Sequence, residues 1–319
     1  MQAVLVQEPD RLEYTSYRDP EPGPGEVLVE LKAAAVNRRD LLVRTGVYPF
    51  PLPLVPGSDG AGVRRDTGEE VVILPALRWG PDEAAPGEGF EILGGPTDGT
   101  YAELIAVPRE NVFPKPAGFS WEEAAAFPLA ALTAYRALFT RANLKGGETV
   151  LVLGAGSGVS TFAVQLACWA GARVIVTSSS EEKLARSREL GAEAGVSYAD
   201  GDWVAAVKEH GPIDVVLDSV GSTWQQSLSC LRAGGRCVVF GGTGGTEVEL
   251  QVRPVYLQQL SLLGTTMGSP DDFHALLRSI ELGRWRPVID SVRPLADVEA
   301  AHARMKAGEQ FGKLVLTCA

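Results

Sequence analysis

The sequence predicts an α/β protein that joins a doubly wound, six-stranded parallel sheet to a mostly-β barrel domain. Two observations predict the sheet. Between Thr149 and Ser179 an apolar run ends in glycines, apolar residues recur at helical spacing, and a second apolar run follows, which is the order of a parallel βαβ unit. Strand-like and helix-like stretches then alternate to about residue 286. The barrel is predicted by short β-like runs before residue 119 that are separated by turns rich in proline and glycine.

Length and composition set the broad class of protein. A chain of 319 residues exceeds what one core usually supports, so two domains are expected. A formal net charge of −11 opposes binding to nucleic acid or to an anionic membrane, and we expect neither as a partner. The N-terminus lacks the pattern of a signal peptide, charges or prolines interrupt every long apolar run, and the four cysteines show no C-x-x-C spacing. These features predict a cytoplasmic protein with reduced thiols.

The strands of the predicted sheet are apolar stretches at residues 149–154, 172–177, 195–198, 214–218, 236–241 and 260–265. Six such strands in two βαβαβ halves predict the order 3-2-1-4-5-6, with a ligand at the carboxyl ends of the strands. The last strand, in LSLLGTT, would lie at an edge of the sheet, where an apolar strand favours pairing with another chain. We therefore expect a homodimer through this edge.

The glycine-rich turn after the first strand is a candidate dinucleotide site. Glycines at the start of a helix let backbone N–H groups and the helix dipole meet a pyrophosphate at close range. Ser160 occupies the position where a third glycine is usual, and it is small enough to keep helix and strand close. Glycines that serve only strand–helix packing are the competing interpretation. The candidate cofactor-binding residues of this turn are Gly154, Gly156, Ser157, Gly158 and Val159.

The end of the second strand predicts which nicotinamide cofactor is bound. A site specific for NAD places Asp or Glu there, where the carboxylate accepts from the ribose 2′-hydroxyl and repels a 2′-phosphate. This sequence has Ser178 and Ser179 instead, with Lys183 close behind. Hydroxyl groups and a lysine suit a 2′-phosphate, so NADPH is preferred to NADH. In the competing interpretation Ser180 caps the next helix, Lys183 is solvated, and either cofactor is accepted.

Several further motifs occur in order along the chain. They are N-x-x-D at 37–40, PGSDGAG at 56–62, DGTYAEL at 98–104, PLAALTAYRAL at 128–138, the glycine-rich turn, and GKLVL at 312–316. In these motifs the chain resembles the medium-chain dehydrogenase/reductase superfamily. The resemblance implies a GroES-like barrel domain of residues 1–118 and 287–319, to which the tail of the chain returns. It also implies a Rossmann dinucleotide-binding domain of residues 119–286.

Two later turns would complete the cofactor site. Phe240, Gly241 and Gly242 lie at the end of the fifth strand, where glycines allow the backbone to approach the nicotinamide ribose. A plain turn is the competing interpretation for these glycines. The resemblance implies a contact with the nicotinamide for three residues after the sixth strand, which are Thr266, Met267 and Gly268.

Zinc alcohol dehydrogenases of this superfamily hold a catalytic metal at positions that carry other residues here. Their cysteine and histidine ligands correspond to Asn37 and Ser58, and a third ligand falls near Leu129. The four cysteines of their structural zinc site are missing from residues 77–95. An amide, a hydroxyl and an alkyl group do not form a zinc site, so we expect no metal. This departure places the resemblance in the zinc-free quinone oxidoreductase-like branch.

The resemblance implies hydride transfer from NADPH to a quinone or another conjugated carbonyl compound, which is electrophilic enough without a Lewis acid. Tyr48 is the candidate catalytic donor to the developing oxyanion, and Asn37 is the second catalytic candidate, positioning cofactor or substrate. In the competing interpretation Tyr48 only packs a loop. Asp40 and Asp59 are weaker candidates, because aspartates at turns usually accept from backbone amides.

Two other functions stay open, namely reduction of an enoyl thioester or enal, and binding of NADPH without turnover. Lys313 of the GKLVL motif is either a solvated lysine beside a strand or a cofactor contact, and it is not assigned to the site. No Ser-His-Asp nucleophile is predicted, since His210, His274 and His302 are all expected at the surface.

Overall fold

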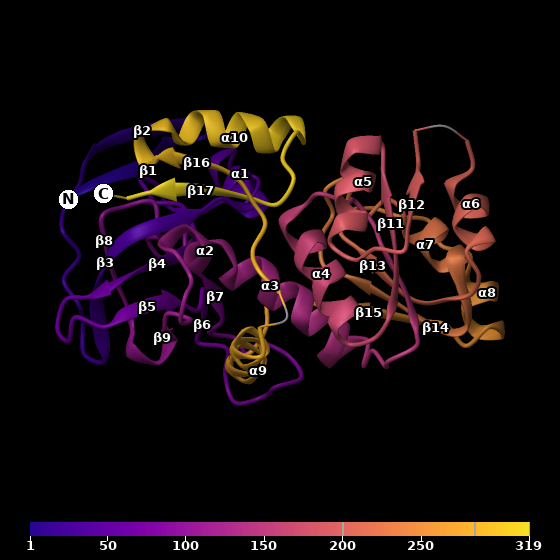
Figure 1. Ribbon diagram of the computed structural model, residues 1–319. Helices are drawn as coiled ribbons and strands as arrows, with labels where there is room; N and C mark the ends of the chain where they lie inside the picture. The colour runs from indigo at the N-terminus through magenta and orange to yellow at the C-terminus, as the bar shows by residue number, and fades with distance from the viewer. Residues whose placement is uncertain (200, 284, 319) are drawn as a thin grey trace. The chain divides into compact units, whose positions relative to one another are not determined.

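The computed structural model describes residues 1–199, 201–283 and 285–318, and the chain separates into two compact units. The first unit is Met1–Leu132 with Ser269–Ala319, and the second is Thr133–Gly268 (Figure 1). The first unit is therefore discontinuous in sequence. Compared with the expected domain boundaries, it also includes residues 119–132 and 269–286.

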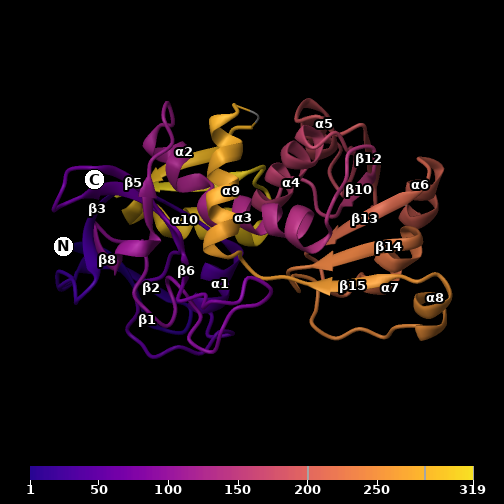
Figure 2. The same cartoon turned by 90° about the horizontal axis from the view of Figure 1, so that it is seen from below.

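A sheet of six parallel strands forms the centre of the second unit. In sheet order the strands are β12 (Ala194–Ser197), β11 (Arg173–Ser178), β10 (Thr149–Val152), β13 (Ile213–Asp218), β14 (Leu231–Val239) and β15 (Ser261–Gly264). Counted along the chain this is 3-2-1-4-5-6, so the predicted doubly wound topology is confirmed. β13, β14 and β15 run in the same direction (Figure 2). β10 is buried along its whole length, which explains why its sequence does not alternate.

The helices of the second unit connect these strands. They are α4 (Gly158–Trp169), α5 (Glu181–Glu189), α6 (Trp203–Glu209), α7 (Trp224–Cys230) and α8 (Val252–Leu257). α5 begins after Ser180, whose side chain accepts from the backbone N–H of Lys183, so Ser180 is a helix cap. Before β10 the chain forms a π-helical segment, η2 (Arg136–Arg141). Nε of Arg141 donates to the carbonyl of Gly264 at 2.9 Å and ties η2 to the edge strand β15.

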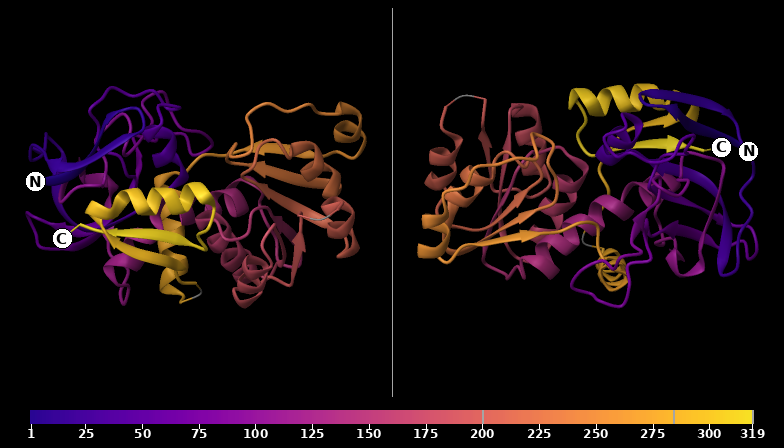
Figure 3. Two further views of the ribbon diagram at one scale, coloured as in Figure 1. Left: turned by 90° about the horizontal axis from the view of Figure 1, so that it is seen from above. Right: turned by 180° about the vertical axis from the view of Figure 1, so that it is seen from behind.

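The first unit is built around a sheet of seven strands. Its main path is β16 (Ile289–Pro294), β17 (Lys313–Thr317), β3 (Glu26–Ala35), β4 (Asp59–Arg64), β5 (Glu70–Ile73) and β9 (Val112–Pro114), while β8 (Leu104–Pro108) pairs with β3. Two short sheets accompany it, β1 (Gln2–Glu8) with β2 (Arg11–Ser16) and β6 (Ala76–Leu77) with β7 (Glu91–Ile92). β17 pairs antiparallel with β3, so the tail of the chain returns to the first unit. α10 (Val298–Ala307) lies along β16 and β17 (Figure 3).

Aromatic packing explains why two further segments belong to the first unit. α2 (Trp121–Ala126) and the start of α3 (Pro128–Tyr135) lie on either side of Phe127, which is fully buried. Phe127 stacks on Phe273 of α9 (Pro270–Glu281) with ring centroids 6.1 Å apart. Trp285 packs edge-on against Phe127 at 6.0 Å. This shared core holds α2 and α9 together although about 140 residues of sequence separate them.

The remaining helices of the first unit are α1 (Arg38–Arg44) and the short 3-10 turns η1 (Arg109–Asn111) and η3 (Leu295–Asp297). Within the described ranges every helix is too short or too polar to cross a membrane. The four cysteines are free, and burial raises the pKa of each thiol, which keeps them protonated and weakly reactive.

Candidate active site

The turn before β4 brings two polar residues into the interior of the first unit. Gly57 has φ +95°, and a Cβ on it would lie 2.3 Å from Cδ1 of Tyr101, so only glycine fits there. Ser58 and Asp59 follow with no exposed surface. The pairing of β4 with β3 sets Asp59 opposite Ala35, close to the start of α1.

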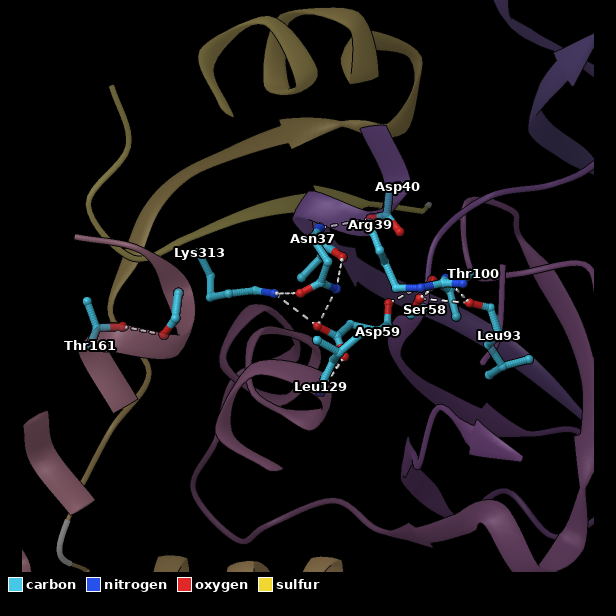
Figure 4. A network of polar contacts seen from close by, with 12 residues as sticks. Asn37, Arg39, Asp40, Ser58, Asp59, Leu93, Thr100, Leu129, Thr161 and Lys313 are labelled. Carbon is cyan, nitrogen blue, oxygen red and sulfur yellow. Dashed lines mark hydrogen bonds and ion pairs between the residues drawn. The ribbon is translucent and has the colours of Figure 1, made fainter. Parts of the chain in front are cut away.

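Asn37, Asp59 and Lys313 form a buried polar cluster (Figure 4). The Lys313 ammonium donates to Oδ1 of Asn37 at 2.6 Å and to Oδ2 of Asp59 at 3.0 Å. Nδ2 of Asn37 donates to the same oxygen of Asp59 at 2.9 Å. The other carboxylate oxygen accepts from the backbone N–H of Leu129 at 2.7 Å. These side chains come from the start of α1, from β4 and from β17, so the fold assembles them from distant parts of the sequence.

Lys313 is the member of this cluster that the sequence did not assign to the site. Its side chain is only 2% exposed, so the interpretation as a solvated lysine is wrong. In the sequence, only its position beside the apolar run LVL indicates that Lys313 could be buried. A lysine at such a position can equally well extend its ammonium into water, so the sequence does not distinguish the two. A fully buried lysine needs a partner, and Asp59 supplies it.

Asn37, one of the two predicted catalytic residues, is held rigidly by the protein. Its amide oxygen accepts from Lys313 and its Nδ2 donates to Asp59, while its backbone N–H donates to Oδ2 of Asp40 at 2.8 Å. The residue is therefore fixed at the N-terminus of α1. A contact of Asn37 with cofactor or substrate stays a prediction.

Arg39 joins Ser58 to the loop after β7. Its Nη1 donates to Oγ of Ser58 and to the carbonyl of Leu93, both at 2.7 Å, and Nη2 donates to the carbonyl of Gly95 at 3.4 Å. Ser58 itself donates to the carbonyl of Leu93 at 2.7 Å. Burial lowers the pKa of Arg39, and the nearby carboxylate of Asp40 opposes this effect. The guanidinium thus stands beside one of the two positions where zinc dehydrogenases carry ligands.

A second buried polar group lies next to Asn37. The hydroxyl of Tyr101 donates to Oδ2 of Asp40 at 2.9 Å and lies 3.4 Å from Nε2 of His302. Burial raises the pKa of Asp40 to about 6 and lowers the pKa of His302 to about 3. His302 is 2% exposed, so the expectation that it lies at the surface is wrong. The reason is that α10 directs this residue toward the core, next to Ala301 and Met305, which are also buried.

The residues at the expected metal positions do not fit zinc. Asn37 and Ser58 are hydrogen-bonded to the cations of Lys313 and Arg39, and Leu129 offers an alkyl side chain. Across the described ranges, no group of three or more His, Cys, Asp or Glu side chains is placed to hold a metal ion. A zinc site needs thiolate, imidazole or carboxylate ligands, so this donor set cannot supply one.

Tyr48, the second predicted catalytic residue, lies in the loop after α1 and is 42% exposed. Its backbone N–H donates to the carbonyl of Leu42 at 3.1 Å, which holds the loop against the helix. The phenol is close enough to Arg39 to interact with its charge. Tyr48 and Asn37 belong to the same unit, and the hydrogen bonds of Asn37 go to other residues.

In the second unit the glycine-rich turn contains two glycines with left-handed backbone conformations. Gly154 and Gly156 have φ +73° and +93°, and a Cβ on Gly154 would meet no atom within 4 Å. Oγ of Ser157 accepts from the N–H of Ser160 at 3.1 Å, which caps α4. Oγ of Ser160 donates to the carbonyl of Gly154 at 2.7 Å. Ser160 therefore ties helix to turn by a hydrogen bond, where a glycine would do so by close packing.

The residues predicted to choose the cofactor lie at the end of β11. Ser178 is buried, and its Oγ accepts from the N–H of Ser180 at 3.1 Å, whereas Ser179 is exposed and Lys183 is partly exposed. Tyr198, which the sequence did not single out, follows β12, and its N–H donates to the carbonyl of Ser178 at 3.1 Å. Its side chain is 46% exposed. The neighbourhood of Tyr198 and Ser178 arises from the pairing of β12 with β11, which no local pattern encodes.

The turn after β14 contains the third group of predicted cofactor residues. Phe240 is partly exposed, and Gly241 and Gly242 are exposed. The neighbouring turn after β13 is fixed by Asp218, whose buried carboxylate accepts from four donors, which are the N–H groups of Val220 and Gly221 and the hydroxyls of Thr223 and Ser227. The N–H of Thr243 donates to the carbonyl of Ser219 at 3.2 Å and joins the two turns.

The last group follows β15. Thr266 is exposed, Met267 is buried with φ +47°, and Gly268 is buried. The hydroxyl of Thr265 is buried and has no hydrogen-bond partner among the described residues. All four predicted groups thus lie at the carboxyl ends of strands in one parallel sheet. An open glycine turn and an unpartnered hydroxyl at this edge fit a bound dinucleotide.

Two family models match the chain. One, described as an alcohol dehydrogenase GroES-like domain, covers residues 23–117, and the other, described as a zinc-binding dehydrogenase, covers residues 158–281. Together with the doubly wound sheet and the glycine turn, they define a two-domain dehydrogenase or reductase that uses a nicotinamide cofactor.

Curated relatives match over nearly the full length. A "zinc-type alcohol dehydrogenase-like protein" of Schizosaccharomyces pombe is 35% identical over 96% of this chain and 95% of its own length. A "quinone oxidoreductase" of Pseudomonas aeruginosa is 35% identical over 97% and 96%. An "acryloyl-coenzyme A reductase" of Metallosphaera sedula is 32% identical over 99% and 100%.

Solved structures of similar proteins also match this chain over all or nearly all of its length. A structure described as an NAD-dependent alcohol dehydrogenase superposes with a TM-score of 0.93 at 38% identity and covers all of both chains. The quinone oxidoreductase of Thermus thermophilus, solved alone and with NADPH, superposes with a TM-score of 0.82 at 32% identity over 99% of this chain and 100% of that chain. The chain belongs to the medium-chain dehydrogenase/reductase superfamily and to its quinone oxidoreductase-like branch.

Proposed function

We propose that this oxidoreductase transfers a hydride from NADPH to a quinone or another conjugated carbonyl compound without a catalytic metal. The proposal rests on the residues at the two expected zinc-ligand positions. Asn37 is hydrogen-bonded to Lys313 and Ser58 is hydrogen-bonded to Arg39. Since an amide and a hydroxyl are not zinc ligands, the proposed substrate is one that is electrophilic without a Lewis acid, as a conjugated carbonyl compound is. The names of the quinone oxidoreductase and acryloyl-coenzyme A reductase relatives support this class of substrate.

The preference for NADPH is part of the proposal. Bound NADPH supplies the hydride, and the end of β11 carries hydroxyls instead of the carboxylate that would repel a 2′-phosphate. We propose that Ser179, Lys183 and Tyr198 hold this phosphate. The similar structures include one described as NAD-dependent and one solved with NADPH, so the choice rests on this chain's own residues.

The test is a comparison of substrates and cofactors with the purified protein. We expect NADPH oxidation with quinones or enones, a lower KM for NADPH than for NADH, and no loss of rate after treatment with a zinc chelator. A saturated carbonyl product would favour the enoyl or enone reductase function. Tight binding of NADPH without turnover on any of these compounds would favour a non-catalytic binding protein, and restoration of activity by zinc would refute the metal-free mechanism.

Tyr48 is proposed as the donor to the oxygen that becomes negatively charged, because its phenol is exposed and near Arg39. Loss of one such donor is expected to lower kcat/KM about tenfold or more in a Tyr48→Phe variant. Tyr14→Phe is the matched control, since Tyr14 is similarly exposed (45%, against 42% for Tyr48) but belongs to β2. An unchanged kcat/KM in Tyr48→Phe would remove this role.

We also propose a homodimer in a reducing cytoplasm. β15 is the last strand of its sheet, and three of its four residues are exposed. Leu262 of this strand and three residues of α8, which are Val252, Tyr256 and Leu257, expose 36% to 71% of their surface. An apolar edge of this kind favours pairing with a second copy of the chain.

A further inference from the structure

The inference concerns Arg39, a partly exposed cation whose hydrogen bonds occupy one side of its guanidinium. Nη1 donates to Ser58 and to the carbonyl of Leu93 (Figure 4). Nη2 donates weakly to the carbonyl of Gly95. A guanidinium carries five N–H donors. Within the part of the chain that the structure describes, Nε–H and the second hydrogen of Nη2 have no acceptor. Two donors and a full positive charge are therefore available to a ligand.

This cation lies beside a position that carries a metal ligand in the zinc dehydrogenases of the superfamily. Nη1 lies 2.7 Å from Oγ of Ser58, which stands where those enzymes carry their histidine ligand. Asn37, which stands where they carry a cysteine, is two residues before Arg39 at the start of the same helix. A permanent positive charge thus lies within one hydrogen-bond length of a former ligand position. Arginine keeps this charge at any physiological pH.

The surface beside Arg39 is aromatic and apolar. Gly95, which accepts from Nη2, packs so closely on Phe50 that a Cβ on Gly95 would lie 2.4 Å from the ring. Val47 and Tyr48 of the same loop are 62% and 42% exposed. A planar conjugated ring can pack on such a surface while its carbonyl oxygen meets a cationic donor.

We propose that Arg39 is a catalytic residue that donates to the carbonyl oxygen of the substrate and stabilises the negative charge that forms there. The inference rests on the proposed function. The substrate gains a hydride at a carbon conjugated with its carbonyl group, as the C4–H bond of the dihydronicotinamide breaks and the cofactor becomes oxidised. The π electrons of the substrate move onto the carbonyl oxygen, and a proton from solvent completes the reduced product. Arg39 thereby takes over the electrostatic task that zinc performs in relatives that hold the metal.

The first measurement compares Arg39→Gln with Arg38→Gln. Arg38 is the adjacent, exposed arginine, and its Nη1 donates to the carbonyl of Met305 at 3.3 Å. We expect Arg39→Gln to lower kcat/KM for a quinone about a hundredfold, because a preorganised donor to an oxyanion is removed. We expect Arg38→Gln to keep the wild-type value. Arg39→Lys keeps the positive charge but loses the planar arrangement of N–H donors, and we expect it to lower kcat/KM about tenfold.

A second measurement does not depend on turnover. The probe is the 2-hydroxy-1,4-naphthoquinone anion, whose binding in the presence of NADP⁺ is followed by its visible absorbance, with neutral 1,4-naphthoquinone as the uncharged control. Loss of a charge-assisted hydrogen bond is expected to raise the Kd of the anion about tenfold in Arg39→Gln, with little change for the neutral compound and for NADPH. The melting temperature and far-UV circular dichroism of each variant are recorded beside it.

The outcomes separate the inference from the proposed function. Wild-type protein that reduces no quinone or enone would refute the proposed function, while a weakened anion affinity in Arg39→Gln would still support a substrate-facing Arg39. A variant that loses thermal stability but keeps both the anion affinity and kcat/KM would show that Arg39 only ties the loop of residues 93–95, and would overturn the inference. If Arg39→Gln does not fold, the Arg39→Lys variant decides, and wild-type values there would overturn the inference as well.

Discussion

Removal of Lys313 should destabilise the first unit strongly, because it leaves the carboxylate of Asp59 buried without its cation. Lys313 is 2% exposed and Asp59 is fully buried. Lys313→Met keeps a similar volume but removes two hydrogen bonds, one of 2.6 Å to Asn37 and one of 3.0 Å to Asp59. The backbone N–H of Leu129 remains as a donor to Asp59 and only partly compensates.

The expected loss follows from this geometry. Breaking a buried ion pair by removal of one partner costs about 3–5 kcal/mol of unfolding free energy. Two hydrogen bonds that involve charged groups, at about 1.5–3 kcal/mol each, give about 3–6 kcal/mol, which overlaps with this range. Asp59→Asn should lower the unfolding free energy by a comparable amount, since it leaves the ammonium of Lys313 buried without a counter-charge. The double variant should lose at least about 2 kcal/mol less than the sum of the single variants, because neither charge then remains.

The assay is urea unfolding followed by tryptophan fluorescence, with the midpoints compared at an unchanged slope. Lys32→Met is the matched control, because Lys32 pairs with Glu30 where both side chains are about one-third exposed. The unfolding free energy of the Lys32→Met variant should fall by less than about 1 kcal/mol. A loss below about 1 kcal/mol in Lys313→Met, or additive losses in the double variant, would refute the argument that the cluster is held by a buried charge pair.

Three further predictions concern pH, cofactor and assembly. Asp40 has a folded pKa of about 6, above its ordinary value of 3.8, so its contribution to the unfolding free energy should increase as the pH falls from 6 to 4. His302 has a folded pKa of about 3, below its ordinary value of 6.5, so its contribution should decrease over the same range. Relative to the H302Q/D40N double variant, the unfolding free energy of H302Q should therefore rise by about 2 kcal/mol and that of D40N should fall by about 2 kcal/mol as the pH falls over this range, and parallel curves would contradict both pKa directions. Lys183→Ala should raise the KM for NADPH about tenfold and leave the KM for NADH unchanged; an equal rise for both would contradict a 2′-phosphate contact. Leu257→Glu should convert a dimer into a monomer in light scattering, and an unchanged mass would exclude α8 from the interface.

The strands of the second unit and their order could be predicted from the sequence. Its strands are buried on both faces, so each is a short apolar run that glycine-rich turns and amphipathic helices separate, and the strand order could be inferred from the βαβ rule. Even in this unit the role of one serine could not be predicted from the spacing of the motif. Ser160 replaces a glycine by a hydrogen bond to the carbonyl of Gly154, which depends on the exact turn geometry.

The first unit was harder to predict, because its contacts join distant segments. Phe127, Phe273 and Trp285 form one aromatic core although the first lies far from the others in sequence. This packing places residues 119–132 and 269–286 in the first unit, whereas the family resemblance implied that they belong to the Rossmann domain. A helical period shows that a helix has an apolar side but not which partner covers it.

By itself the sequence determined the doubly wound sheet, the glycine turn at Gly154, and the absence of zinc-ligand residue types at positions 37 and 58. These features are local, since they depend on residue type, spacing and the order of elements. Tertiary structure alone decided that Lys313 is buried against Asp59, that His302 lies in the core, and that Arg39 stands beside Ser58. The reason is physical: a charged or polar residue has the same place in the sequence whether its side chain ends in water or in the interior, and only packing of segments from elsewhere in the chain removes the water and supplies the partner.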